Sequence, residues 1–389
     1  MSMNNRTRIK AILNYKDYDR MPVVHFGFWS DTLDKWCEQG HLSLEESGKN
    51  WGDAKPIDKT IGDKLGFDFN WYNTFSPDIS IRPVFKREVL QVHEDGSREV
   101  RNYCGNIELE KDGAGSIPAE IDHLLKNRQS WEEYFLPKLK FTEDRIYKSL
   151  VNTSQRMLPL LDGGLEYLKN EQRSEHVGLY CGSLFGNIRN WLGVEGLSYL
   201  YIDDEKLFDE IIDTVGELSF KCVETVLSTG AKFDFGHFWE DICFKNGPLV
   251  NPSVFESKVG PHYKRITVLL NQNGIDIVSL DCDGLIDALI PTWLNNGVNT
   301  MFPIEVGTWN ASIQPWREKY GRQLRGVGGM NKTAFARDYA AIDAEIERLK
   351  PLVELGGYIP CPDHRIPPDA KWENVQYYCE KFRRAFSQS

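Results

Sequence analysis

The sequence lacks long apolar runs, paired cysteines and an excess of basic residues, and each absence argues against one class of protein or of partner. No run approaches the 18 apolar residues that suggest a membrane-spanning helix. The net charge of −11 argues against nucleic acid as a partner, because nucleic acid requires a basic face. The eight cysteines contain no CxxC pair, which favours free thiols: Cys37, Cys104, Cys181, Cys222, Cys243, Cys282, Cys361 and Cys379. With no apolar segment typical of a signal peptide near Met1, we expect a cytoplasmic protein that does not associate with membranes.

Several catalytic signatures are also missing. No GxGxxG follows an apolar run, and neither a Walker loop nor a GxSxG elbow is present. These absences argue against a dinucleotide-binding fold, a P-loop NTPase and a serine hydrolase. What the chain does have is 41% hydrophobic residues, 11 Trp and 16 Tyr, which support a large core and a concave site lined with aromatic rings.

Short apolar runs alternate with helical stretches along the whole chain. Helices are predicted over 4–15, 205–227 and 252–272, and eight strands over 23–28, 67–72, 177–181, 233–239, 275–281, 300–305, 324–328 and 357–361. No Gly-rich or Ser-rich linker divides the chain, so we predict a single α/β domain over residues 1–389, a (β/α)8 TIM barrel. Two doubly wound domains are the alternative. The β-rich runs around Glu94-Asp95-Gly96 predict a β-hairpin insertion over 82–104, after the second strand.

Four of the predicted strands end in acidic residues or lead to an acid–His pair. These ends are Glu240-Asp241, Asp281-Cys282-Asp283, Glu305 and Asp363-His364. Active sites of TIM barrels form at this end of the strands, so the acids should meet at one mouth. Carboxylates that converge must hold a proton or share a cation, and oxygen ligands with one imidazole suit zinc, manganese or iron(II). The predicted metal ligands are Asp281, Asp283, Glu240, Glu305 and His364, and the predicted catalytic residues are His364, Asp281 and Asp283.

Simpler roles remain open for each of these residues. Asp283 could cap a helix, and His364 could be hydrogen-bonded locally in a loop stiffened by prolines. An ion-pair network with Lys245, Arg265 or Arg325 would also satisfy the acids. Thiolate ligation of zinc is a further alternative, because cysteines also fall at strand ends: Cys181, Cys282 and Cys361, with Cys243 just beyond one.

Aromatic and basic residues near the strand ends are candidates for substrate binding. Trp29, Trp71, Tyr72 and Trp239 could surround an aromatic ring, or could simply pack in the core. Arg365 could pair with a substrate carboxylate or with Asp363. The full predicted set is His25, Trp29, Trp71, Tyr72, Arg189, His237, Trp239 and Arg365.

Three segments resemble the uroporphyrinogen decarboxylase superfamily. They are Arg6 through Asp19-Arg20-Met21-Pro22-Val23, the turn Gly247-Pro248-Leu249-Val250-Asn251-Pro252, and Gly356-Gly357-Tyr358-Ile359. The resemblance extends nearly from end to end and implies a TIM barrel. The superfamily contains decarboxylases of tetrapyrroles and zinc-dependent methyltransferases that work with corrinoid proteins.

The residues after the first strand favour the methyltransferase branch. True decarboxylases carry two arginines there, whereas this chain reads Val24-His25-Phe26-Gly27-Phe28-Trp29. The methyltransferases bind zinc through His-x-Cys and a later Cys, and those positions resemble Asp281-Cys282-Asp283 and His364 here. An oxygen-rich site suits activation of an ether or amine better than activation of a thiol.

The resemblance therefore implies methyl transfer from a small methylated substrate, such as a methoxyaromatic compound, to cobalamin. The chain lacks an Asp-x-His-x-x-Gly corrinoid motif, so the cobalamin should arrive on a partner protein. Decarboxylation of uroporphyrinogen or another carboxylated substrate is the second hypothesis. A binding protein without catalytic activity is the third.

Overall fold

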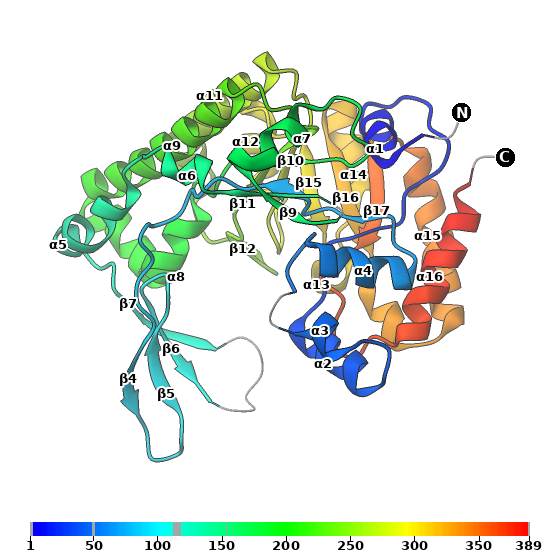
Figure 1. Cartoon of the computed structure of the whole chain (residues 1–389). Helices are drawn as coiled ribbons and strands as arrows, with labels where there is room; N and C mark the ends of the chain where they lie inside the picture. Colours follow the sequence, from blue (N-terminus) through cyan, green and yellow to red (C-terminus); the bar gives the residue numbers. More distant parts are fainter. Residues whose placement is uncertain (1–2, 49–50, 112–117, 154, 388–389) are drawn as a thin grey trace.

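A parallel β-sheet forms the centre of the molecule (Figure 1). The computed structural model describes residues 3–48, 51–111, 118–153 and 155–387. Seven strands pair in the order β17-β16-β15-β14-β11-β10-β3, and every ladder between them is parallel. Their bounds are β3 Thr74–Phe75, β10 Gly178–Tyr180, β11 Phe235–Trp239, β14 Val278–Asp281, β15 Thr300–Ile304, β16 Arg325–Met330 and β17 Tyr358–Pro362.

Two further strands, β1 (Val24–His25) and β2 (Phe69–Asn70), form a separate parallel ladder. The chain turns after β2, so that β2 pairs with β1 whereas β3 pairs with β10. Among the described residues the ladders therefore do not close into a barrel, although the prediction of an α/β fold is confirmed. Each of the eight predicted strand ranges overlaps an observed strand, and β3 is an addition to them.

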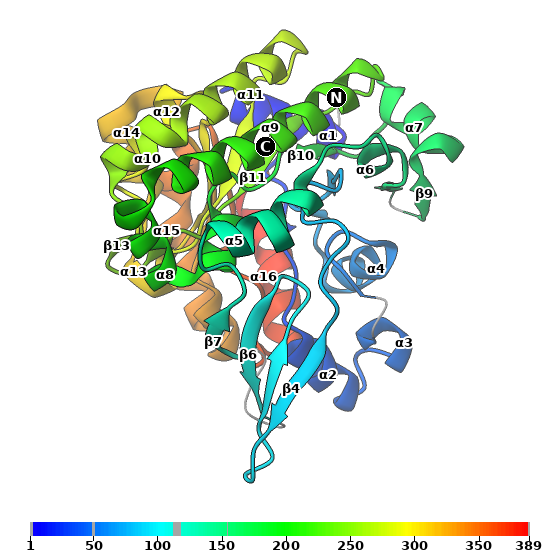
Figure 2. The same cartoon turned by 90° about the vertical axis from the view of Figure 1, so that its left-hand side faces the viewer.

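The longer helices pack around the sheet (Figures 1 and 2). Helix α1 begins after Asn4, whose side chain accepts a hydrogen bond from the backbone N–H of Thr7. The helix predicted over 252–272 is divided at Val259 into α10 and α11. The helices of eight residues or more, with α10, are α1 Asn5–Leu13, α2 Ser30–Glu38, α4 Pro56–Leu65, α8 Gly186–Asp203, α9 Glu205–Ser228, α10 Pro252–Lys258, α11 Gly260–Gln272, α14 Ile313–Tyr320, α15 Tyr339–Glu354 and α16 Trp372–Ala385.

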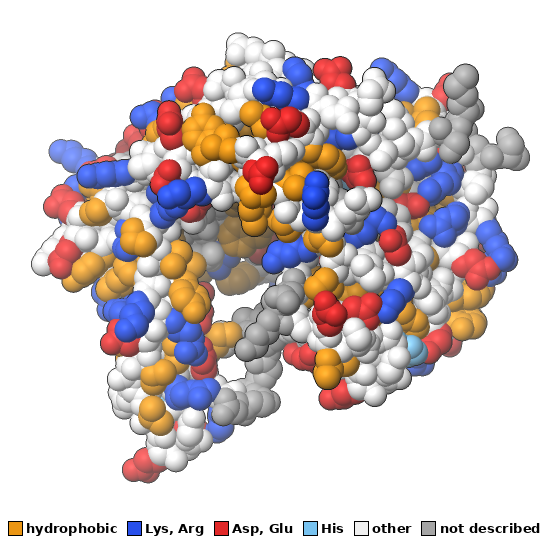
Figure 3. Space-filling model, viewed as in Figure 1, with side chains coloured by type: hydrophobic (Ala, Val, Ile, Leu, Met, Phe, Trp, Pro, Cys, Tyr) orange, Lys and Arg blue, Asp and Glu red, His pale blue; other side chains and the backbone are white. Residues whose placement is uncertain are grey.

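An antiparallel sheet projects from the body as an arm (Figures 1 and 2). Its strands pair in chain order: β4 Glu88–Val92, β5 Arg98–Arg101, β6 Asn106–Glu110 and β7 Ala119–His123. The β4–β5 pair surrounds the Glu94-Asp95-Gly96 turn, and β6 and β7 continue the sheet past residue 104. Short elements follow the central strands on the side from which the arm projects, among them β12 (Cys243–Phe244) and α13 (Val306–Trp309). The surface is hollowed between the arm and the segment that holds α2 and α4 (Figure 3).

The remaining short helices are α3 Leu44–Ser47, α5 Arg128–Ser130, α6 Asp144–Tyr147, α7 Leu165–Lys169 and α12 Ile290–Asn295. The remaining short strands are β8 Leu150–Asn152, β9 Met157–Pro159 and β13 Gly247–Pro248. All eight cysteines are free, as predicted, and six of them are buried. Within the part of the chain that the structure describes, no helix combines the length and apolar character needed to cross a membrane.

Candidate active site at the strand ends

Three aspartates meet where β11 and β14 end. Each of Asp241, Asp281 and Asp283 offers a carboxylate oxygen, and these oxygens lie within 4.8 Å of one another. The register of the sheet produces this meeting, because Trp239 at the end of β11 lies opposite Asp281 at the end of β14. We call Asp241, Asp281 and Asp283 the aspartate cluster.

Local backbone geometry fixes the cluster. Asp241 adopts a positive φ of 48°, in the left-handed region that a non-glycine residue rarely enters. Its carboxylate oxygen Oδ1 accepts a hydrogen bond of 3.0 Å from the backbone N–H of Asp283. The turn after β11 is thus tied directly to the turn after β14.

The aspartates repel one another in a poorly solvated place. Burial and the charge of Asp283 raise the pKa of Asp241 to about 7. Burial, together with the charges of Asp241 and Asp283, raises the pKa of Asp281 well above its usual range. The cluster therefore either retains a proton near neutral pH or requires a cation.

Glu240, a predicted metal ligand, lies outside the cluster, and that prediction is corrected here. Its buried carboxylate accepts hydrogen bonds from the backbone N–H groups of Leu184, Phe185 and Gly186 at distances of 2.9, 2.9 and 2.6 Å, and from the hydroxyl of Tyr263. These N–H groups belong to the beginning of α8, where an anion is favoured. Side chains alternate along a strand, so the residue that shares a face with Trp239 is Asp241.

Glu305 borders the cluster through the loop after β14. Its carboxylate accepts hydrogen bonds from the backbone N–H of Gly284 (2.7 Å) and the hydroxyl of Thr308 (2.6 Å). Burial and the nearby charge of Asp283 raise the pKa of Glu305. Glu305 holds the loop in place, and its oxygens are not among those that meet in the cluster.

His364 reaches the cluster from the end of β17. Its Nε2 atom lies 3.3 Å from Oδ2 of Asp283. The ring stacks on Trp29, with centroids 5.4 Å apart and planes inclined by 15°, and Phe26 contacts its edge. Both predicted catalytic positions at Asp283 and His364 therefore lie side by side, with the imidazole held flat against an indole.

Arg365, the next residue, pairs with Asp53 and not with Asp363. Two hydrogen bonds of 2.9 and 2.6 Å join its guanidinium to the Asp53 carboxylate. The guanidinium also lies over the rings of Trp51 and Tyr72, 5.9 and 5.8 Å from their centroids. The hydroxyl of Tyr72 donates a hydrogen bond to the carboxylate of Asp281, so this pair adjoins the cluster.

Three predicted substrate-binding residues are enclosed below the mouth. His25, Trp71 and His237 are all at most 2% exposed. Burial lowers the pKa of His237 to about 3, and neither of its ring nitrogens has a hydrogen-bond partner among the described residues. Trp71 stacks on Phe235, with centroids 4.7 Å apart. His25 lies instead against α4, with Nε2 4.0 Å from Oδ2 of Asp58, so the structure does not bring it to the cluster.

Arg189 and Trp239, by contrast, are half-buried at the mouth. Arg189 donates a hydrogen bond of 2.7 Å to the backbone carbonyl of Asp241. Cys282, between the two aspartates, is buried, and its sulfur accepts a hydrogen bond from the backbone N–H of Ile242. Burial raises the pKa of Cys282 well above its usual range, which disfavours a thiolate.

The sequence prediction did not include Asp241 or Asp53 among the candidate site residues. Side-chain alternation after β11 was a usable signal for Asp241. Asp53 gave no signal, because 312 positions separate it from Arg365. Together, the mouth offers three carboxylates, an imidazole and a tyrosine hydroxyl, which suits cation binding or proton transfer to a bound substrate.

Comparison with known proteins finds likenesses among solved structures. No protein-family model matches the chain, and no curated protein matches it. Among solved structures, the chain is similar to a methyltransferase from Methanosarcina mazei, with a TM-score of 0.60 and 14% sequence identity. The match covers 98% of this chain and 99% of that one, so the likeness in fold extends over the whole molecule.

Proposed function

We propose that this protein is a methyltransferase that moves a methyl group from a small methylated substrate to a corrinoid carried by a partner protein. The observation that carries the proposal is the full-length likeness in fold to a methyltransferase, with the aspartate cluster at the strand ends. The sequence resemblance to the uroporphyrinogen decarboxylase superfamily supports the same branch.

A barrel-like arrangement belongs to this proposal. β1 lies against β17 as well as pairing with β2. A parallel bridge between Phe28 and Ile366 continues this contact past the strands. We interpret the sheet and the β1–β2 ladder as a (β/α)8 barrel whose hydrogen bonding is interrupted on both sides of the β1–β2 pair.

The donor set of the cluster fits a hard divalent cation. Asp241, Asp281 and Asp283 would hold it through carboxylate oxygens, the ligands that magnesium and manganese prefer. Zinc, which the superfamily resemblance implies, would favour His364 as an additional ligand. When bound, such a cation would act as a Lewis acid on the atom that leaves the methyl group.

The side chains around the cluster have distinct tasks in this mechanism. When a methyl group would pass from an ether to the nucleophilic corrinoid, the electron pair of the broken C–O bond would stay on oxygen, and a proton must neutralise the resulting alkoxide. A quaternary ammonium substrate would leave a neutral amine and would need no proton. His364 is placed to deliver the proton to an alkoxide, since its Nε2 atom already interacts with Asp283. Trp29 holds the imidazole plane by stacking on it.

The proposed substrate is small and uncharged or cationic. Arg365 is engaged by Asp53, and Arg189 by a backbone carbonyl, so neither guanidinium is available as a clamp for several carboxylates. The carboxylates of the cluster would repel a polyanion. This arrangement favours methyl transfer over the decarboxylation of a tetrapyrrole.

Elemental analysis of the purified protein tests the metal part of the proposal. We expect about one divalent metal ion per chain after incubation with manganese or zinc, and loss of that ion in Asp281→Ala. Substrate consumption is then measured with methoxyaromatic compounds, with and without cob(I)alamin. Consumption that depends on cob(I)alamin supports methyl transfer, whereas release of CO2 without it supports decarboxylation.

A further inference from the structure

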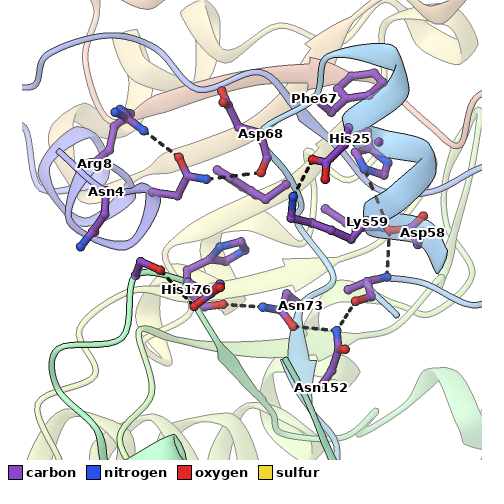
Figure 4. Close-up of a pocket in the computed structure, with 18 of the residues that line it drawn as sticks. Asn4, Arg8, His25, Asp58, Lys59, Phe67, Asp68, Asn73, Asn152 and His176 are labelled. Atoms are coloured by element: carbon purple, nitrogen blue, oxygen red, sulfur yellow. Dashed lines mark hydrogen bonds and ion pairs between the residues drawn. The ribbon is translucent and has the colours of Figure 1, made fainter. Parts of the chain in front are cut away.

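A second polar cavity lies away from the aspartate cluster, between α1, α4, β2 and β8 (Figure 4). Its volume is about 390 Å³, within the range of pockets that bind small molecules. The cavity lies beside the turn at which the ladder changes from β2 to β3. Asn70 and Asn73, on either side of this turn, both line the cavity.

A buried carboxylate that pairs with no cation among the described residues lines this cavity. Asp58 is fully buried on α4. Its Oδ2 atom accepts hydrogen bonds from the backbone N–H of Ala54 (3.1 Å) and from Nδ2 of Asn70 (2.9 Å). Within the part of the chain that the structure describes, its Oδ1 atom has no hydrogen-bond partner. The indole N–H of Trp51 is near enough to lower the pKa of Asp58 slightly, but it does not reach hydrogen-bond geometry.

The nearby basic groups are engaged elsewhere. Figure 4 shows Arg8 and Lys59 at the cavity. Arg8 pairs with Asp19 and Lys59 with Asp63, at 2.8 and 2.5 Å.

Arg20 and His25, which also line the cavity, do not neutralise the charge of Asp58 either. Arg20 forms two hydrogen bonds of 2.7 Å with Asp68. His25 lies 4.0 Å from Asp58, but burial, with a smaller contribution from Arg365, lowers its pKa to about 3 and keeps it neutral. Burial and the charge of Asp53 raise the pKa of Asp58 to about 7.

Two more acceptors of the cavity lack partners. Asn152 donates from Nδ2 to the backbone carbonyl of Ala54 and to Oδ1 of Asn73. Both of those partners are acceptors, which fixes the amide so that the unpartnered atom is Oδ1. His176 is buried and neutral, since burial lowers its pKa to about 4, and its Nε2 atom is also unpartnered. Its interaction with the backbone of Asn70 leaves Nε2 as an acceptor.

The three unpartnered groups share one chemical need. Asp58, Asn152 and His176 all offer acceptors, and leaving a buried acceptor without a donor is costly. A carboxylate also needs positive charge when it is buried. We propose that this cavity binds a small organic molecule whose primary ammonium group pairs with Asp58 and whose second hydrogen-bond donor reaches Asn152.

Ethanolamine and ethylene glycol form a matched pair of probes. They have the same length and a common hydroxyl, and they differ in that ethanolamine carries an ammonium group. Isothermal titration of the full chain near neutral pH should show saturable binding of ethanolamine and at least about tenfold weaker binding of ethylene glycol. Equal affinities for the two probes, or no saturable binding of ethanolamine up to about 100 mM, would overturn the proposal.

Variants place the binding in this cavity. Asp58→Asn should weaken ethanolamine binding at least about tenfold, and Asn152→Ala about threefold or more. Asp34→Asn is the control, because Asp34 is an exposed aspartate on α2 and does not line the cavity. It should retain affinity to within about twofold. If Asp58→Asn does not fold, unchanged affinity in Asn152→Ala refutes the assignment instead.

Discussion

The two ends of strand β11 present the same residue type in opposite electrostatic settings. Asp234, just before the strand, is buried among Arg6, Lys10 and Arg173, at distances of 2.6, 2.9 and 2.9 Å. Burial raises the pKa of Asp234, but the three cations outweigh it and hold that pKa below its usual range. Asp241, just after the strand, faces other carboxylates, and its pKa is raised to about 7.

This contrast separates a stabilising end of the sheet from the end at which we propose the reaction, which we call the reactive end. At the beginning of β11, cations are supplied by α1 and by the segment before β10. At the end of β11, Arg189 donates its hydrogen bond to the backbone carbonyl of Asp241 and not to the carboxylate, so the charge of that carboxylate is not neutralised by an ion pair of this kind. In α/β barrels, residues at the strand beginnings stabilise the fold, whereas residues at the strand ends perform chemistry.

The largest expected effect is on turnover at the reactive end. Asp281→Asn keeps the shape of the side chain but removes a carboxylate from the cluster, so we expect turnover with cob(I)alamin to fall by about 10²- to 10⁴-fold. Thermal unfolding of this variant should match or exceed that of the wild type, because a repelling charge has been removed. The control is Asp276→Asn, an exposed position just before β14. Wild-type turnover in Asp281→Asn would contradict the proposed site.

At the stabilising end, Asp234→Asn should reduce the free energy of unfolding by about 3–5 kcal/mol. The variant leaves the buried guanidiniums of Arg6 and Arg173 without their counterion. Urea unfolding measures this loss. Asp63→Asn serves as the comparison, because its exposed pair with Lys59 should contribute less than about 1 kcal/mol. Equal losses in the two variants would abolish the distinction between the ends.

The pH dependence of stability should also reveal the reactive end. Asp241 has an ordinary pKa of 3.8 in the unfolded chain and about 7 in the folded protein. As pH rises from about 4 to 7, the unfolded chain releases this proton first, so folding stability falls. We expect a fall of about 1–3 kcal/mol in the free energy of unfolding, and a smaller one in Asp241→Asn.

Manganese provides a second measurement of the same effect. A bound cation favours the ionised carboxylates, so its stabilisation of the fold should increase with pH over the same window. Urea unfolding at about pH 5 and pH 7.5, with and without manganese, gives the comparison. The same pH slope in the wild type and in Asp241→Asn would show that Asp241 does not carry a raised pKa.

The smallest expected effect concerns Tyr72, whose hydroxyl donates to Asp281. Tyr72→Phe removes one hydrogen bond to a carboxylate, so manganese affinity should weaken by about five- to tenfold at neutral pH. Tyr377→Phe is the control, since Tyr377 makes an equivalent hydrogen bond to Asp343 far from the cluster in sequence. Titration of manganese into both variants measures the difference. Equal affinities would mean that Tyr72 does not tune the cluster.

Much of the sheet could be predicted because buried parallel strands are short apolar runs. The split between β2 and β3 could not, because aromatic and polar residues are mixed in the same way on both sides of the turn, from Phe67 to Phe75. Tertiary packing determines the neighbour of each short strand: β2 pairs with β1, whereas β3 pairs with β10. The extension of the antiparallel sheet through β6 was equally hidden, since Glu108 and Glu110 make that strand highly polar.

The candidate site was predictable where the strand end itself carries the residue. Asp281, Asp283 and His364 lie together because the ends of parallel strands share one edge. Choosing Glu240 over Asp241 failed because it ignored side-chain alternation past the end of β11. The pairing of Arg365 with Asp53 depends on loop geometry that no local pattern encodes.

Asn70 belongs to both polar sites of the molecule. Its Oδ1 atom accepts a hydrogen bond of 2.8 Å from the backbone N–H of Tyr72, while its Nδ2 atom donates to Asp58. Thermodynamic linkage between two ligands is reciprocal. If a ligand in the cavity shifts Asn70 and so changes the binding free energy of a cation beside Tyr72 and Asp281, that cation changes the binding free energy of the ligand by the same amount. With both proposed ligands bound, this amide would couple the two sites, and the coupling would be measured as the change in ethanolamine affinity caused by saturating manganese.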